Sequence, residues 1–174
     1  MSPNETFLGM GGLAVTADSS QVLTTIGLGS CVGVALLDPR RHAVGLAHVI
    51  FPQAPSPEVD EPGKYADTAV ATLLTALARL GSARSSLAAV LVGGARMFSF
   101  GRAIEFDFGA TNVAAVEQAL AAASIPISAR ATGGSIGRSL RVHAGDGVVS
   151  LREGRGDSEL YRAPTGQRYL GATR

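Results

Sequence analysis

The hydrophobic pattern of this chain changes from short strand-like runs to a helical period near residue 65. Before that point, apolar runs bounded by turn-prone residues predict strands at residues 13–17, 21–26, 31–37 and 43–50. From residue 65 to residue 80 the apolar side chains recur every three or four positions, which predicts an amphipathic helix that ends at Gly81. The proline-rich, polar residues 52–63 predict a loop before this helix.

The second half of the chain continues the alternation of strands and helix. A second helical period is predicted to begin at Asn112, a residue suited to a helix cap, and to end near residue 123. Short apolar runs predict further strands at residues 87–92, 126–130, 139–143 and 148–151. From residue 153 the chain is polar and glycine-rich, so we expect one domain over residues 1–152 and a mobile C-terminal tail over residues 153–174.

Many strands and two main helices predict an α+β fold. The early strands are expected to follow one another as hairpins, whereas each helix can cross over a mixed sheet. A chain of 174 residues is long enough to bury a core as one domain, and we expect a monomer because no apolar stripe remains uncovered.

Composition and charge exclude several classes of function. The net charge of +1 gives no broad attraction to nucleic acid or to an anionic membrane surface. No apolar run approaches the length that spans a bilayer, and the first residues do not have the pattern of a signal peptide. A single cysteine cannot form an internal disulfide, which suits a reducing compartment. We therefore expect a cytoplasmic protein with no direct membrane insertion.

The lone cysteine, Cys31, and His48 occupy matching positions on two successive predicted strands. If a two-residue turn pairs Asp38 with Arg41, Cys31 lies directly opposite His48, with Cβ atoms about 5 Å apart. Pro39 cannot adopt the primed turn that such hairpins prefer, so a bulge or a slip of the register is expected as well. An imidazole beside a thiol can accept its proton and later protonate a leaving group, which is the chemistry of nucleophilic catalysis.

Other groups near the cysteine could complete such a site. Gly29 and Ser30 precede Cys31 in a flexible segment whose backbone N–H groups could stabilise an oxyanion, and Thr25 is the nearest hydroxyl on the incoming strand. A free cysteine is also common as a small buried core side chain, so the spacing alone leaves both interpretations open. His42 and His143 are expected to be solvated and structural, respectively.

Three further patterns are weaker. Residues 93–94 and 133–137 are rich in glycine and predict tight turns, or alternatively a phosphate cradle. Met97, Phe98 and Phe100 are either core side chains or an apolar patch for a partner. No group of His, Cys and carboxylate residues has the spacing of metal ligands, so no metal is expected.

Taken together, five segments of this sequence resemble one known family, the chemoreceptor glutamine deamidases called CheD. The segments are LGSCVGV at 28–34, GLAHVIFP at 45–52, KYAD at 64–67, GGARMF at 93–98 and TGGSIGR at 132–138. Their order and spacing agree over about residues 9–151, including the seventeen-residue step from Cys31 to His48.

This resemblance implies a fold, an activity and partners. The fold is a three-layer α/β/β sandwich, and the activity is hydrolysis of particular receptor glutamines to glutamates through a cysteine thioester, with no cofactor. It implies that Cys31 is the nucleophile, His48 the general base and acid, and Thr25 the polar third member. The implied partners are the cytoplasmic helical region of chemoreceptors and a CheC-type phosphatase. An alternative is a non-catalytic binding module that regulates that phosphatase.

Overall fold

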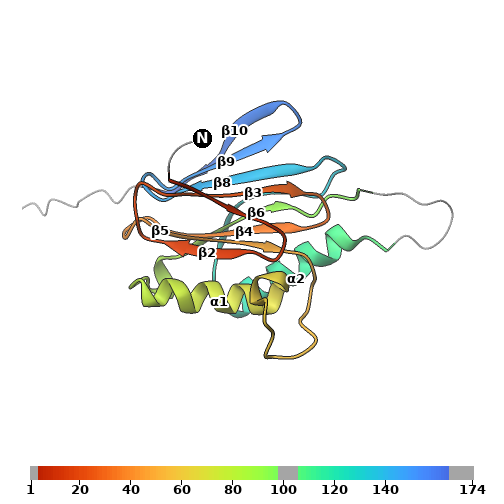
Figure 1. Ribbon diagram of the computed structural model, residues 1–174, viewed down its shortest axis with the longest axis horizontal. Helices are drawn as coiled ribbons and strands as arrows, with labels where there is room; N and C mark the ends of the chain where they lie inside the picture. Colours follow the sequence, from red (N-terminus) through yellow and green to blue (C-terminus); the bar gives the residue numbers. More distant parts are fainter. Residues whose placement is uncertain (1–3, 98–105, 165–174) are drawn as a thin grey trace, which may run out of the picture.

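The computed structural model describes residues 4–97 and 106–164, which form three stacked layers (Figure 1). Two helices make one outer layer, a sheet that we call the central sheet lies beneath them, and a second sheet, the outer sheet, covers its other face. The helices are α1 (Ala66–Arg79) and α2 (Phe108–Ala122), with short 3-10 turns at Pro62–Lys64 and Arg84–Ser86. The predicted α+β, three-layer α/β/β architecture is confirmed.

Both sheets have five strands and are mixed. In spatial order, the central sheet contains β2 (Leu13–Thr16), β5 (Ala43–Val49), β4 (Val32–Asp38), β6 (Ala88–Gly93) and β7 (Ile127–Thr132). The outer sheet contains β1 (Glu5–Leu8), β3 (Val22–Leu28), β8 (Arg138–His143), β9 (Val148–Glu153) and β10 (Gly156–Arg162). Each helix connects two parallel strands, as expected for crossover connections: α1 joins β5 to β6, and α2 joins β6 to β7.

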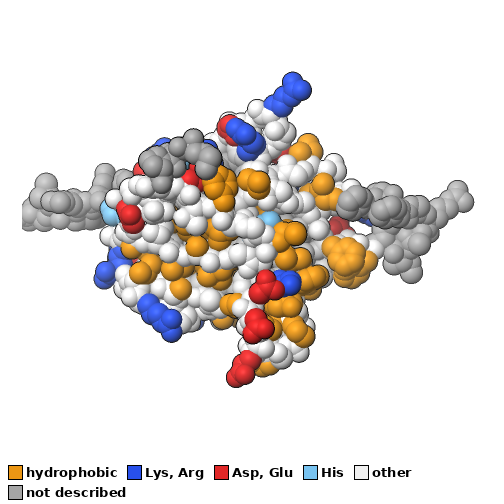
Figure 2. Space-filling view, in the orientation of Figure 1, with side chains coloured by type: hydrophobic (Ala, Val, Ile, Leu, Met, Phe, Trp, Pro, Cys, Tyr) orange, Lys and Arg blue, Asp and Glu red, His pale blue; other side chains and the backbone are white. Residues whose placement is uncertain are grey.

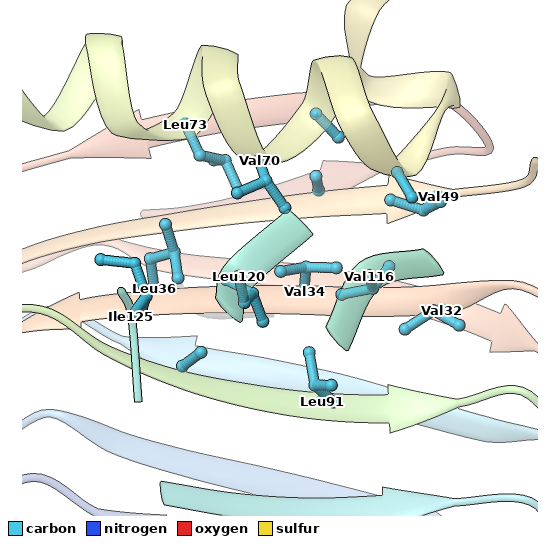
Figure 3. Close-up of a cluster of buried hydrophobic side chains, with 14 of the residues drawn as sticks. Val32, Val34, Leu36, Val49, Val70, Leu73, Leu91, Val116, Leu120 and Ile125 are labelled. Carbon is cyan, nitrogen blue, oxygen red and sulfur yellow. The ribbon is translucent and has the colours of Figure 1, made fainter. Parts of the chain in front are cut away.

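The central sheet is buried on both faces, which explains the uninterrupted apolar runs of β4 and β5. Alternate side chains of β4 point to opposite sides. Val32, Val34 and Leu36 pack beneath the helices (Figure 3), whereas Ala35 and Leu37 pack between the two sheets. On the helix side, Val70 and Leu73 of α1 and Val116 and Leu120 of α2 complete the core (Figure 3).

The first strands do not form the expected hairpin. β2 pairs with β5 in the central sheet, and β3 pairs with β1 and β8 in the outer sheet. Between them, the Asp18 carboxylate accepts hydrogen bonds from the backbone N–H and the hydroxyl of Ser20. This local turn carries the chain from one sheet to the other instead of folding it back, because each strand buries its apolar face against a different layer.

The second helix begins earlier than predicted. Its first residue is Phe108, and the Asp107 carboxylate caps it by accepting the backbone N–H of Ala110 at 2.9 Å. Asn112 is therefore not the cap, because it lies in the second turn of the helix and is buried. The first helix was predicted correctly, apart from one residue at each end.

The expected boundary at residue 152 is also corrected. Residues 156–162 form strand β10, paired antiparallel with β9 at the edge of the outer sheet. Polar side chains cover this strand, and ion pairs such as Arg152–Asp157 at 2.7 Å accompany the backbone ladder. Because an edge strand with little apolar surface carries no clear hydrophobic alternation, its sequence resembles a tail. The remaining residues of the predicted tail, 165–174, lie outside the described residues.

The surface in Figure 2 shows acidic side chains grouped over the loop between β5 and α1, whose sequence contains Glu58, Asp60 and Glu61. Hydrophobic side chains lie beside them on the same face (Figure 2). In the described part of the chain, no helix has both the length and the apolar character needed to cross a membrane.

Candidate active site

Cys31 lies in the loop between β3 and β4, one residue before β4 begins. Its side chain is half-buried and packs against the core between the two sheets. Three consecutive carbonyl groups fix this loop. The Gly29 carbonyl accepts the N–H of Ala95 at 2.7 Å, the Ser30 carbonyl accepts the side-chain amide of Asn112 at 3.0 Å, and the Cys31 carbonyl accepts the N–H of Gly94 at 2.8 Å. The thiol is thus carried on a rigid loop.

His48 lies in β5 with its side chain between the sheets and only 1% exposed. Its Nδ1 atom is 2.7 Å from the hydroxyl oxygen of Thr25, which comes from β3 of the other sheet. The same hydroxyl donates its proton to the carbonyl of Leu8 at 2.9 Å, and a carbonyl can only accept. Thr25 must then accept the proton of Nδ1. This contact fixes the neutral imidazole with its free lone pair on Nε2.

The Nε2 atom of His48 is buried, and no hydrogen-bond partner for it exists within the described residues. A buried acceptor without a partner costs free energy and is uncommon in folded proteins. Such an atom is ready to receive a proton from a neighbouring group. The imidazole therefore has the orientation and the free lone pair of a general base.

The predicted register between Cys31 and His48 is wrong by two positions along β4. Asp38 pairs with Ala43, not with Arg41, and Gly33 lies opposite His48. The connection comprises residues 39–42, because Pro39 cannot enter a two-residue primed turn and His42 takes the left-handed conformation with φ of 53°. Because the pairing is shifted by two residues, the thiol stays on the face of the central sheet that carries the imidazole. Cys31 directly precedes β4, so its position continued along the strand is diagonal to His48. Diagonal neighbours in a sheet have Cβ atoms about 7 Å apart.

The two groups are neutral at neutral pH. Burial raises the pKa of the Cys31 thiol, and a hydrogen bond from its own backbone N–H acts in the opposite direction with a smaller effect. Burial also lowers the pKa of His48. Both shifts disfavour the charged forms, so the resting pair is a thiol and an imidazole rather than a thiolate and an imidazolium.

This charge state can be tested by alkylation. Because the chain has a single cysteine, uptake of iodoacetamide measures Cys31 alone. We expect the rate to keep rising with pH through a midpoint above about 8.5, the ordinary value for a thiol. The raised thiol pKa leaves little thiolate at neutral pH. A rate that is high and flat between about pH 5 and 7 would instead show an ion pair and would contradict this assignment.

The other predicted site residues surround the same loop. The N–H of Gly29 donates to the Gly27 carbonyl at 3.0 Å, so this group is not free to bind an oxyanion. Gly29 is nevertheless needed for space, because a Cβ atom there would lie 2.8 Å from Cγ of Met97. Ser30 contributes the carbonyl held by Asn112. Met97 is 43% exposed beside the loop, and Phe98 and Phe100 lie outside the described residues.

Sequence reasoning missed the contribution of Asn112. It was expected to cap a helix, but its side chain reaches the cysteine loop and the end of β5. At the start of a predicted helix an asparagine is already explained by capping, so its type carries no separate signal for these contacts. No cluster of three or more His, Cys, Asp or Glu side chains in residues 4–97 and 106–164 is placed to hold a metal ion.

The two remaining histidines lie away from this site. His42 is exposed in the loop between β4 and β5, with Nδ1 2.9 Å from the Gly145 carbonyl. His143 is half-buried at the end of β8. The glycine-rich segment at 133–137 forms a turn between β7 and β8, with positive φ at Gly133 and Gly134.

Residues 50–153, more than half of the chain, match the family model described as CheD chemotactic sensory transduction. The chain belongs to the CheD family. A relative from Symbiobacterium thermophilum is 42% identical over 157 residues, covering 88% of this chain and 95% of its own.

Two other CheD relatives are similarly close. The protein from Desulfitobacterium hafniense (strain DSM 10664 / DCB-2) is 39% identical over 138 residues, covering 79% of this chain and 86% of its own. The protein from the archaeon Methanococcus vannielii is 38% identical over 143 residues, covering 82% and 90%. All three relatives are named probable chemoreceptor glutamine deamidase CheD. A solved structure, the hypothetical protein YfiH of Bacillus licheniformis, is 17% identical with a TM-score of 0.42 over 71% of this chain and 49% of its own, a likeness too slight to bear on function.

Proposed function

We propose that this CheD-family protein is a protein-glutamine deamidase that converts glutamine side chains of chemoreceptors to glutamate. The observation that carries the proposal is the Thr25–His48 contact, which leaves the Nε2 lone pair free on the face of the sheet that carries the Cys31 thiol. The names of the CheD relatives supply the substrate. In this proposal Cys31 is the nucleophile, His48 the base and acid, and Thr25 the group that orients the imidazole.

In the first stage, Nε2 of His48 takes the proton of the Cys31 thiol as the sulfur attacks the carboxamide carbon of glutamine. A carbon–sulfur bond forms, and the carbonyl oxygen becomes an oxyanion. Backbone N–H groups of the cysteine loop, in particular that of Cys31, stabilise this charge. His48 then returns the proton to the amide nitrogen, the carbon–nitrogen bond breaks, and ammonia leaves a thioester on Cys31.

In the second stage, Nε2 of His48 takes a proton from a water molecule, whose oxygen attacks the thioester carbon. The carbon–sulfur bond breaks, the thiolate recovers the proton from His48, and glutamate is released. Water is consumed and ammonia is produced, so this cycle needs no cofactor. The neutral resting pair suits this scheme, because His48 must hold a free lone pair at the start of each stage.

The substrate we propose is the cytoplasmic helical region of a chemoreceptor. Cys31 is half-buried at the surface end of a loop, and Gly29 presents no side chain beside it. A side chain on a folded helix can approach such a position without entering a deep cavity. We accordingly expect the protein to act in the cytoplasm as a monomer.

The proposal is tested by incubating the purified protein with chemoreceptor cytoplasmic fragments. We expect release of ammonia and a mass increase of about one dalton at each modified glutamine, as an amide becomes a carboxylate. Peptide mapping of the fragment before and after incubation identifies the sites. A fragment panel with neither ammonia nor any mass change would contradict the proposal.

The family resemblance also implies binding to a CheC-type phosphatase. This role is separable from catalysis, because binding does not require a reactive thiol. A protein that altered phosphatase activity but modified no receptor fragment would be a binding module and not a deamidase. Running both assays on the same preparation distinguishes the two functions.

A further inference from the structure

We propose that Asn112 is a positioning residue that holds the peptide group between Ser30 and Cys31, so that the Cys31 N–H faces the reacting carboxamide oxygen. This inference rests on the proposed deamidase function and deepens it. It assigns a role to a helix side chain that does not itself touch the thiol.

The side-chain amide of Asn112 joins the two segments that carry the thiol and the imidazole. Its Nδ2 atom donates one proton to the Ser30 carbonyl at 3.0 Å and the other to the Ile50 carbonyl at 2.8 Å. Ser30 precedes Cys31 directly, and Ile50 follows His48 by two residues. Because both partners are carbonyl oxygens, only the NH2 group of the amide can face them. Asn112 is 2% exposed, so water does not compete for these contacts.

The contact with Ser30 controls the direction of the Cys31 N–H. A trans peptide group is planar, and its C=O and N–H bonds point in opposite directions. Asn112 holds the Ser30 oxygen at one edge of this planar group, so the N–H of Cys31 projects from the opposite edge, toward its own thiol. An oxyanion formed at the carbon attacked by this sulfur lies beside the same N–H. A rotation of this peptide would remove the donor from the site.

Asn112 supplies the one side-chain contact among the three that fix the loop. The carbonyls of Gly29 and Cys31 are held by backbone N–H groups, those of Ala95 and Gly94. The carbonyl of Ser30 is held by the Asn112 side chain. A substitution at residue 112 therefore releases the central peptide of the loop, together with the Ile50 carbonyl, and leaves the contacts of the Gly29 and Cys31 carbonyls in place.

The structure gives little reason to expect asparagine here for stability alone. The Oδ1 atom of Asn112 is buried, and it has no hydrogen-bond partner within the described residues. An unpaired buried acceptor and a poor helix former both cost free energy. An apolar side chain, such as that of Val116 one turn later, fills a buried helix position without this cost. The amide is explained by its two donated hydrogen bonds.

The test compares Asn112→Ala and Asn112→Asp with the matched control Val116→Ala. Asn112→Asp keeps the shape of the side chain but removes both donors, and Val116→Ala weakens the packing of the same helix without removing a hydrogen bond to the cysteine loop. With a receptor fragment as substrate, we expect both Asn112 variants to lower kcat by about 10²-fold, with KM changed by less than about threefold. Val116→Ala should lower the melting temperature yet keep kcat within about threefold of wild type.

A second measurement needs no substrate. Amide hydrogen exchange, followed by mass spectrometry, should accelerate by about tenfold or more in the peptide that contains residues 29–32 of each Asn112 variant, and not in Val116→Ala. Unchanged exchange, unchanged kcat in the Asn112 variants, or an equal loss of kcat in Val116→Ala would overturn the positioning role. If wild type modifies no receptor fragment, the deamidase proposal fails, and the exchange experiment still decides whether Asn112 holds the loop.

Discussion

Replacing Cys31 with alanine will reduce ammonia release from receptor fragments to background, a loss of more than about 10⁴-fold. The reason is that no other thiol exists in the chain, so no other side chain can form the proposed thioester. The fold should survive, because the Cys31 side chain is only half-buried and the hydrogen bonds that fix its loop do not involve the thiol. We expect the free energy of unfolding to fall by about 1 kcal/mol or less. The measurements are ammonia release and urea denaturation of the same preparation.

Cys31→Ser is the matched control for this substitution. It restores a polar atom of similar size and retains the loop, but its hydroxyl is a far weaker nucleophile at neutral pH. Both variants should therefore be inactive and folded. Substantial deamidation by Cys31→Ala would contradict the proposed thioester mechanism. Loss of deamidation with unaltered effects on a CheC-type phosphatase would show that catalysis and binding are separate properties.

Replacing Gly93 with alanine will lower the free energy of unfolding by about 3–5 kcal/mol. Gly93 has φ of 113°, beyond the left-handed region that other residues can enter. A Cβ atom there would also overlap the Cys31 carbonyl oxygen, which accepts the N–H of Gly94 at 2.8 Å. The substitution thus combines backbone strain with disruption of the cysteine loop. The midpoint of urea denaturation measures the effect.

Gly154→Ala serves as the control for Gly93→Ala. Gly154 also has a positive φ, of 60°, but nothing lies within 4 Å of the position that its Cβ would take. In this variant the free energy of unfolding should fall by only about 1–2 kcal/mol, the cost of a positive φ for a residue with a Cβ atom. Equal destabilisation by the two substitutions would show that the contact with the Cys31 carbonyl is unimportant. If Gly93→Ala remains folded, its rate of Cys31 alkylation should also change, unlike that of Gly154→Ala.

The sequence was most informative where a strand is buried on both faces. β4 and β5 produce uninterrupted apolar runs, and α1 produces a clear helical period, so these elements were predicted closely. β1 and β10 were missed, because most of their side chains are exposed and both strands are held by backbone pairing with a neighbour. Strands held mainly by backbone pairing need no regular alternation of apolar and polar residues, so the sequence pattern does not reveal them.

In the candidate site, too, the residues suggested by nearby sequence were predicted, whereas contacts between residues far apart in the chain were not. Cys31 and His48 were proposed from their positions on successive predicted strands, although the assumed turn gave the wrong register. Thr25 could be selected as the nearest hydroxyl, and the structure brings it to the imidazole from the other sheet. Asn112 was missed because its partners are backbone carbonyls far away in the sequence, and backbone groups carry no sequence signal.

Gly33 shows how closely this chemistry depends on the stacking of the layers. It lies opposite His48, and a Cβ atom there would be 2.9 Å from Leu140 and 3.6 Å from Thr25. The bare backbone at this point lets the two sheets approach until a hydroxyl on one reaches the ring on the other. Imidazole and hydroxyl thus separate as soon as one sheet slides over its neighbour. Heating should therefore inactivate the enzyme at a temperature at which its secondary structure is still intact.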